Sequence, residues 1–294
     1  MSVRRTLARS SALTDLAYRV FQSRARLAPA GAPPRVLVNS FPKAGTHLVM
    51  TALDHYPGMR FSGIFLPQPP ITNVAVDADT AAAQEREWER VEASLERAKP
   101  GQYVTAHFHP APRFLEILEK LGYRTVFVCR DPRDIVVSTA LYFSRLRRHP
   151  HHRRFAEGHG SDKERMLAVI TGFGGDQTGP AMAGLGPRLQ WYLPWMQAPS
   201  TLPCRFEDLV GERGGGSSEE QLRALRDIGR HINRPLTDEM AADIARRTWS
   251  TKTTTFRGGV GGAWRAHFDD DLRQEFSREV GDELLAAYGY EADP

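Results

Sequence analysis

Residues 40–48 read Ser-Phe-Pro-Lys-Ala-Gly-Thr-His-Leu, and no other stretch of the chain is as informative. An apolar run, Val36–Val38, precedes it, and the residues from Thr46 to about His55 have the pattern of a helix. A strand, a short glycine-containing turn and a helix together aim backbone N–H groups and the positive end of a helix dipole at one anion. Lys43 adds a positive charge, and Gly45 lets the backbone approach a ligand closely. The stretch therefore predicts a loop that holds the anionic end of a nucleotide.

The order of residues in this loop differs from that of a Walker loop. In GxxxxGK[ST] the lysine and a hydroxyl residue follow the second glycine, so that the hydroxyl can hold Mg²⁺. Here Lys43 comes before Gly45 instead. We therefore expect the site to bind an anion without an obligatory metal ion.

A second segment has the same strand-to-helix pattern. Residues Arg124–Cys129 read as a buried parallel strand, and a helix with Asp131 as its N-cap is expected to follow. This places Arg130 at the carboxyl end of a strand, where open α/β sheets bind their ligands. A structural salt bridge from Arg130 to Asp131 or Asp134 is the alternative, and the residues alone leave both open.

Together these segments resemble the sulfotransferases that use 3′-phosphoadenosine 5′-phosphosulfate (PAPS). Residues 42–46 are similar to the family's 5′-phosphosulfate loop, and residues 130–138 to its 3′-phosphate segment. Residues 256–268, Phe-Arg-Gly-Gly-Val-Gly-Gly-Ala-Trp-Arg-Ala-His-Phe, resemble the loop that closes over the cofactor, and Phe206–Leu209 resembles the family's YEDL strand end. These matches keep the family's order over roughly residues 36–290.

The resemblance implies an α/β fold: a single domain with a central, mostly parallel sheet flanked by helices, in a P-loop-like arrangement that binds PAPS. It implies a sulfotransferase that moves a sulfuryl group in line to a hydroxyl or amine, leaving adenosine 3′,5′-bisphosphate as product. The acceptor is expected to be a small molecule, a lipid or a saccharide. No metal is expected to be required.

The same resemblance assigns the site residues. Those expected at the cofactor are Lys43, Ala44, Gly45, Thr46, His47, Arg130, Ser138, Trp249, Arg257, Gly258 and Gly259. Lys43 is expected to stabilise the charge that builds on the leaving oxygen. Arg130, Arg257 and Ser138 are expected to hold the 3′-phosphate, since the guanidinium fork suits a dianion.

The sequence also departs from the family's pattern. Leu48 stands where a tryptophan often packs on adenine, and Trp249 either takes over that role or belongs to the core. Gly258 replaces a common lysine, and Phe206 replaces a tyrosine. None of these departures removes an essential charge.

An acceptor hydroxyl needs a base. The family places a histidine at the end of the strand that follows the first long connection, and residues 103–110 are similar to that region. His107 aligns best with that position, and strand alternation predicts that His109 lies on the same side. An ordinary pKa of about 6.5 suits proton abstraction near neutral pH. We therefore expect His107 to be the base, with His109 as the fallback and His47 as a third candidate.

Length and composition agree with a single α/β domain. The chain has 294 residues and a net charge of +4. Its two cysteines, Cys129 and Cys204, lie in apparent strands, which favours reduced thiols and a cytoplasmic protein. No apolar run is long enough to span a membrane. Helical patterns between apolar strands are read at Arg113–Leu121, Ile135–Arg147, Lys163–Phe173, Leu185–Met196, Glu219–Ile232, Thr237–Arg247 and, as one or two helices, Asp269–Ala287.

Residues 1–34 are expected to form a basic helical extension, and residues 35–294 the sulfotransferase domain. The segment Leu13–Leu27 has helical spacing with arginines opposite its apolar face. Packing on the domain is the favoured interpretation, and contact with an anionic membrane surface is the alternative.

The densest charge lies in Arg145–Arg154, which reads either as a solvated loop or as an entrance that guides an anionic acceptor or PAPS. The chain has no nucleic-acid reader motif, so nucleic acid is not an expected partner. Two other functions stay open at this point. One is a kinase with a degenerate phosphate loop, and the other is a non-catalytic module that binds nucleotide or sulfated glycan.

Overall fold

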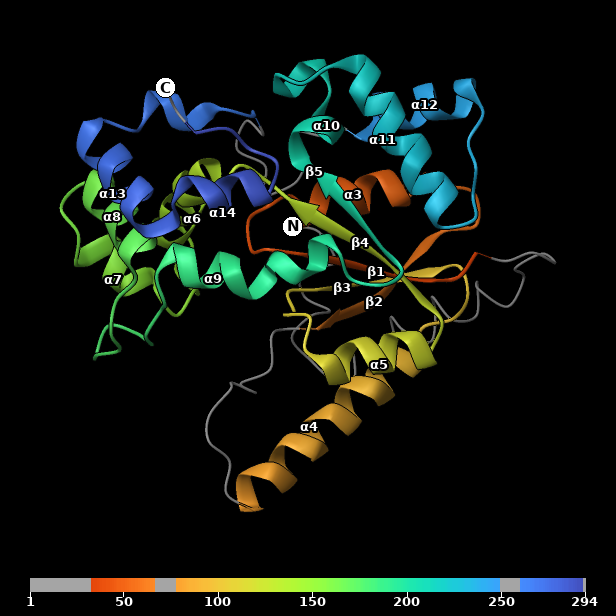
Figure 1. Ribbon diagram of the computed structural model, residues 1–294, viewed down its shortest axis with the longest axis horizontal. Coiled ribbons are helices and arrows are strands. Elements are labelled where there is room, and N and C mark those ends of the chain that lie inside the picture. The colour runs from red at the N-terminus through yellow and green to blue at the C-terminus, as the bar shows by residue number, and fades with distance from the viewer. Residues whose placement is uncertain (1–32, 67–77, 249–259, 293–294) are drawn as a thin grey trace.

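The computed structural model describes residues 33–66, 78–248 and 260–292. Its centre is one five-stranded sheet in which every neighbouring pair is parallel, in the order β2-β3-β1-β4-β5. The strands are β1 (Arg35–Ser40), β2 (Arg60–Leu66), β3 (Gln102–Ala106), β4 (Tyr123–Cys129) and β5 (Thr201–Arg205). The expected single α/β domain with a parallel sheet is confirmed (Figure 1).

Helices cover both faces of the sheet, as a parallel sheet requires. In chain order they are α3 (Thr46–Leu53), α4 (Ala78–Glu96), α5 (Pro112–Lys120), α6 (Pro132–Arg145), α7 (His152–Glu157), α8 (Asp162–Thr171), α9 (Leu185–Tyr192), α10 (Phe206–Val210), α11 (Ser218–His231), α12 (Asp238–Thr248), α13 (Asp270–Val280) and α14 (Asp282–Ala287). Three short 3₁₀ helices join them: η1 (Leu193–Met196), η2 (Glu212–Gly214) and η3 (Ala263–Ala266).

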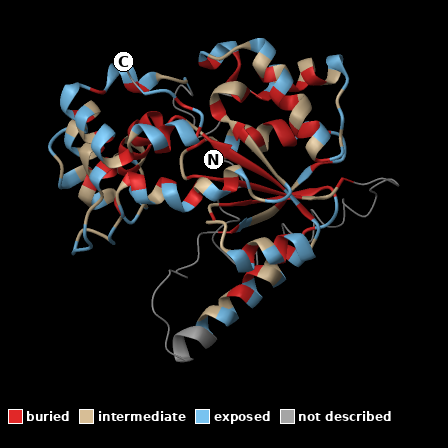
Figure 2. Cartoon of the chain, in the orientation of Figure 1, coloured by how far each residue is buried: buried red, intermediate tan, exposed pale blue. Residues whose placement is uncertain are grey.

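Alternation along β1 divides the core into two layers. Leu37 packs with α4, α5, α6, α8 and α9 on one face. Val36 and Val38 pack with α3, α10, α11 and α12 on the other. Figure 2 shows the result: the three central strands β1, β3 and β4 are buried along nearly their whole length. Because both faces are covered, the edge formed by the carboxyl ends of the strands is the natural place for a ligand.

Local sequence explains where the helices begin and end. Asp131 caps α6, since its side chain accepts a hydrogen bond from the backbone N–H of Arg133, and Pro132 is the first helical residue. The stretch Asp269–Ala287 forms two helices because Gly281, with φ of 72°, interrupts it. Each of the other helices predicted between residues 113 and 248 overlaps an observed helix.

Two local features differ from the sequence interpretation. Phe206–Leu209, expected at a strand end, begins the short helix α10 directly after β5. Helix α4 was not predicted, because its mostly polar sequence has no motif.

The predicted extension over residues 1–34, including Leu13–Leu27, lies almost entirely outside the described residues. Within the described ranges, no helix is both long and apolar enough to cross a membrane.

Candidate active site

Four segments leave the sheet at the edge formed by the carboxyl ends of its strands. Three of them carry motifs that resemble the family's, and the fourth carries the candidate base His107. Asn39 of β1 is in register with Ala106 of β3. On the other side of β1, Ser40 pairs with Val128 of β4, and Cys129 pairs with Arg205 of β5. The residues that follow these strands therefore begin side by side, in the order His107, Phe41, Arg130 and Phe206. This register brings together parts of the chain that are far apart in sequence.

The loop after β1 is tight and uses left-handed backbone at two positions. Lys43 has φ of 73° and Gly45 has φ of 114°. A non-glycine residue in this region is uncommon and strained, and such strain is concentrated at functional sites. A Cβ atom at Gly45 would lie 2.5 Å from Cδ2 of Phe206, so this position accepts only glycine without movement of that ring. Helix α3 then begins at Thr46, whose Oγ1 lies 2.6 Å from Oγ of Ser40.

Lys43 extends toward α6. Its Nζ lies 3.7 Å from the centroid of the Tyr142 ring, at cation–π distance. Burial, followed by the charge of Lys43, lowers the pKa of His47. The ammonium group is therefore close to the start of α3 and to the last turn of α6.

His107 is held in a defined orientation by the same loop. Its Nδ1 lies 2.8 Å from the Ser40 carbonyl oxygen and 3.3 Å from Ser40 Oγ. Because a carbonyl only accepts, Nδ1 is the protonated nitrogen, and Nε2 of the neutral ring has a free lone pair. Burial lowers the pKa of His107, the hydrogen bond to Ser40 opposes this, and the charges of His47 and Lys43 lower it further. The ring is thus a neutral imidazole with its basic nitrogen directed away from Ser40.

Asn39 fixes the chain beside His107, and sequence reasoning missed it. Its Nδ2 donates to the Phe108 carbonyl and its Oδ1 accepts from the Phe108 N–H, both at 2.9 Å. The Tyr192 hydroxyl donates to the His107 carbonyl at 3.1 Å, and the Trp195 indole donates to the Phe108 carbonyl at 2.7 Å. A buried asparagine at the end of an apolar strand was the available signal, because buried polar groups must be paired.

His109 contacts a different element. Its ring lies 4.7 Å from that of Tyr192 and 5.3 Å from that of Trp191, both on α9, and burial lowers its pKa to about 4. Strand β3 ends at Ala106, so the alternation that placed His107 and His109 together does not extend to them. His107 is hydrogen-bonded to Ser40 at the end of β1, whereas the His109 ring packs against α9.

Arg130 follows β4, as predicted, and is held by three groups. Its Nη2 donates to the Val260 carbonyl at 3.0 Å and lies 3.5 Å from Oδ2 of Asp134, while its Cζ lies 4.2 Å above the Phe206 ring. Its buried Nε has no hydrogen-bond partner among the described residues. The structural salt bridge considered above therefore forms with Asp134, and it leaves Nε unused within the described residues. Asp131 is paired with Arg133 instead, at 2.8 Å.

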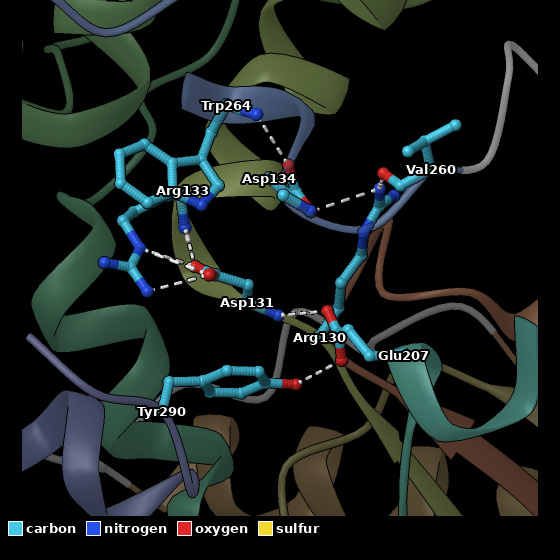
Figure 3. A network of polar contacts seen from close by, with 9 residues as sticks. Arg130, Asp131, Arg133, Asp134, Glu207, Val260, Trp264 and Tyr290 are labelled. Atoms are coloured by element: carbon cyan, nitrogen blue, oxygen red, sulfur yellow. Dashed lines mark hydrogen bonds and ion pairs between the residues drawn. The ribbon is translucent and has the colours of Figure 1, made fainter. Parts of the chain in front are cut away.

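Carboxylates bind the C-terminal part of the chain next to Arg130 (Figure 3). Asp134 accepts the backbone N–H groups of Gly262 and Trp264 at 2.8 and 2.9 Å. Glu207, in the segment that resembles the YEDL motif, accepts the Asp131 N–H at 3.0 Å and the Tyr290 hydroxyl at 2.7 Å. Burial raises the pKa values of Asp134 and Glu207, and these hydrogen bonds oppose the shift.

The basic stretch Arg145–Arg154 divides into two parts. His149 and His151 turn inward, with rings 4.1 and 4.9 Å from that of Phe143, and burial lowers the pKa of His149 to about 4. The exposed cations of the stretch are Arg145, Arg147, Arg148 and Arg153. The histidines therefore form a neutral aromatic wall, and only the outer part is a charged surface.

Several expected residues remain to be placed. Ser138 lies on α6, partly buried, and Ala44 lies in the tight loop. Trp249, Arg257, Gly258 and Gly259 lie outside the described residues. Among the residues that are described, no group of three or more His, Cys, Asp or Glu side chains is arranged to hold a metal ion.

Comparisons with known proteins identify relatives of the fold. Neither a protein-family model nor a curated protein sequence matches the chain. Solved structures do match, with low identity. Mouse sulfotransferase SULT7A1 complexed with PAP is 16% identical over 87% of this chain and 89% of its own, with a TM-score of 0.54. Retinol dehydratase in complex with androsterone and inactive cofactor PAP is 15% identical over 90% and 85%, with a TM-score of 0.53. Retinol dehydratase in a complex with retinol and PAP is 16% identical over 91% and 86%, with a TM-score of 0.54. The chain thus has the fold of these proteins.

Proposed function

We propose that this chain is a PAPS-dependent sulfotransferase that transfers a sulfuryl group to an acceptor hydroxyl. One observation carries the proposal. The phosphate loop, His107, Arg130 and Phe206 follow four neighbouring strands and begin at the same edge of the sheet. Three of these segments match family motifs, and His107 aligns with the family's base. The fold they share with PAP-bound structures supports the same assignment.

The residues present fit a nucleotide that carries anions at both ends. We assign the 5′ end to the backbone of Ala44, Gly45 and Thr46, where a helix begins, and to Lys43 and His47. We assign the 3′-phosphate to Arg130, whose buried Nε lacks a described partner, and to Ser138, Arg257 and the backbone of Gly258 and Gly259. Trp249 is assigned to the adenine. The nucleotide, when bound, supplies an activated sulfuryl group on a phosphate leaving group.

The roles of Lys43 and His107 follow from their surroundings. Nε2 of His107 accepts the proton of the acceptor hydroxyl while Nδ1–H stays on the Ser40 carbonyl, which keeps the ring in one tautomer. The Lys43 ammonium is placed to stabilise the charge on the leaving oxygen, an interaction stronger in the transition state than in the ground state. The base and the cation thus act from neighbouring strand ends.

Exposed aromatic side chains favour an acceptor with an apolar body. Phe65 and Trp191 are 51% and 45% exposed. They are two of the three large apolar residues that are exposed in the described part of the chain. Phe65 packs edge-on against His107 with ring centroids 5.6 Å apart, and Trp191 packs against His109. We therefore place small-molecule and lipid hydroxyls before saccharides as acceptors.

We also propose the cytoplasm as the compartment, because Cys129 and Cys204 are free buried thiols.

A labelled-sulfate transfer screen over phenols, aliphatic alcohols, lipids and saccharides tests the function. We expect transfer from PAPS to at least one apolar hydroxyl compound, and in Lys43→Ala a fall in the single-turnover rate that is much larger than the fall in nucleotide affinity. No transfer to any class, together with no thermal shift on addition of adenosine 3′,5′-bisphosphate, would overturn the proposal. A thermal shift with Mg²⁺·ATP alone would point to a kinase, and one with sulfated glycan alone to a binding module.

A further inference from the structure

Asp134 connects two parts of the active site that are far apart in sequence (Figure 3). Its side chain is only 1% exposed and lies in the first turn of α6. Oδ2 accepts the Gly262 N–H and lies 3.5 Å from Nη2 of Arg130, and Oδ1 accepts the Trp264 N–H. One carboxylate therefore binds both Arg130 and residues 260–267, here named the C-terminal segment.

The C-terminal segment in turn orients Arg130. The Val260 carbonyl accepts a hydrogen bond from Nη2, the same nitrogen that faces Asp134. The Phe206 ring covers the guanidinium from another side. With Nη2 engaged in this way, Nε is left as a buried donor without a partner in the described chain. The direction in which Arg130 offers its remaining donors thus depends on how the C-terminal segment is docked.

The charge of Asp134 also needs an explanation. An isolated carboxylate this close to Arg130 would repel the 3′-phosphate that we assign to that arginine. Two backbone N–H groups and one guanidinium offset the charge, so that it serves to hold those groups in place. A carboxylate has the two acceptor oxygens that this requires, whereas an amide has one acceptor and one donor group.

We propose that Asp134 is a positioning residue that makes recognition of the 3′-phosphate depend on the docked C-terminal segment. It does so by holding that segment and Arg130 at once, without touching the nucleotide. The inference rests on the proposed function, since it presumes a nucleotide with a 3′-phosphate. It predicts that discrimination between nucleotides with and without this phosphate is lost when only Asp134 is changed.

The test compares the affinities of adenosine 3′,5′-bisphosphate and adenosine 5′-monophosphate by titration calorimetry. In Asp134→Asn we expect the affinity for the bisphosphate to fall about 10- to 100-fold, the range for a lost charged hydrogen bond. The affinity for the monophosphate should change less than about twofold, since that ligand does not use Arg130. In the double variant Arg130→Ala/Asp134→Asn, the ratio of the two affinities should be the same as in Arg130→Ala alone.

Asp131→Asn is the matched control, because Asp131 is a buried carboxylate in the same turn. Its side chain pairs with Arg133, whose guanidinium lies over the Trp264 ring, and within the described residues no hydrogen bond or ion pair joins the Asp131 side chain to Arg130 or to the backbone of the C-terminal segment. We expect a lower melting temperature in Asp131→Asn with the ratio of the two affinities preserved. Equal loss for both nucleotides in Asp134→Asn, or additive losses in the double variant, would overturn the inference. If the wild type itself does not prefer the bisphosphate, the proposed function fails along with the inference.

A measurement on the wild type covers the case in which Asp134→Asn does not fold. Hydrogen exchange at the Gly262 and Trp264 amides reports directly on their bonds to Asp134. We expect adenosine 3′,5′-bisphosphate to slow exchange at both amides by at least about fivefold more than saturating monophosphate does, because the 3′-phosphate stabilises the docked arrangement. Equal protection by both nucleotides would contradict the coupling.

Discussion

The two sides of the active site are held together by different kinds of interaction. On the β1–β3 side (residues 40–46 and His107), backbone geometry and neutral hydrogen bonds fix the groups, as the pairs Asn39–Phe108 and Ser40–His107 illustrate. On the β4–β5 side (Arg130, Asp134, Glu207 and the C-terminal segment), charged groups and backbone N–H donors do so. The arrangement of the first side, apart from the chemistry of Lys43 and His107 themselves, is therefore expected to depend on shape more than on charge. The second side is expected to depend on its charged groups more than on its shape.

The largest expected effect is on the β1–β3 side. His107→Ala removes the proton acceptor and should lower kcat roughly 10²–10⁴-fold, with nucleotide affinity little changed. Stopped-assay kinetics and nucleotide titration measure the two quantities. His109→Ala is the control, because that ring packs against Trp191 and Tyr192 of α9. If His109→Ala abolishes turnover and His107→Ala does not, the base has been assigned to the wrong histidine.

On the β4–β5 side, Arg130→Ala should affect binding more than chemistry. We expect the dissociation constant of adenosine 3′,5′-bisphosphate to rise about 10- to 100-fold, with a smaller change in the single-turnover rate at saturating PAPS. Arg124→Ala is the charge control, since Arg124 is exposed and lies on β4, six residues before Arg130. Similar losses in both variants would mean that net charge, and not the position of Arg130, governs nucleotide affinity.

This contrast also explains how far the sequence could predict the site. The β1 loop is a local pattern of strand, Lys43, Gly45 and helix, so a continuous stretch of residues specifies it. The same holds for Arg130, since the strand before it and the cap after it are both readable. The fold class followed because strands and helices alternate along the chain.

The partners of Arg130 could not be predicted in the same way. Asp134 is bonded to Gly262, 128 positions later, and Glu207 to the Asp131 N–H, 76 positions earlier. Such contacts depend on sheet register and on packing, and no local pattern encodes either. The separation of His107 from His109 was missed for a related reason. It depends on where β3 ends, and element boundaries are the least certain part of a sequence reading.

Asn39→Ala tests whether the β1–β3 side depends on shape. The change leaves the Phe108 N–H buried without its partner, which should lower stability by about 1–3 kcal/mol. The segment with His107 would shift as well, so kcat should fall about tenfold while the pH dependence is retained. Trp195→Phe is the control, because it removes the second donor to the Phe108 carbonyl, together with part of a fully buried ring, while Asn39 stays in place. A larger loss of kcat in Trp195→Phe than in Asn39→Ala would show that Asn39 does not position His107.

The smallest expected effect concerns the protonation of His107. Burial, opposed by the Ser40 hydrogen bond and reinforced by His47 and Lys43, lowers its pKa below the ordinary value of 6.5. The base acts in its neutral form, so kcat/KM should rise with pH through a midpoint below 6.5 and stay level at neutral pH. Removing a nearby positive charge favours the protonated ring, so Lys43→Met should raise this pKa without restoring the ordinary value, because burial is the main cause of the lowering. NMR titration of the imidazole measures the pKa directly in both proteins, even where turnover of the variant is too slow to follow. A wild-type pKa at or above 6.5 would mean that the ring is not buried in solution. A lower pKa in Lys43→Met than in the wild type would mean that the ring is not close to the ammonium group.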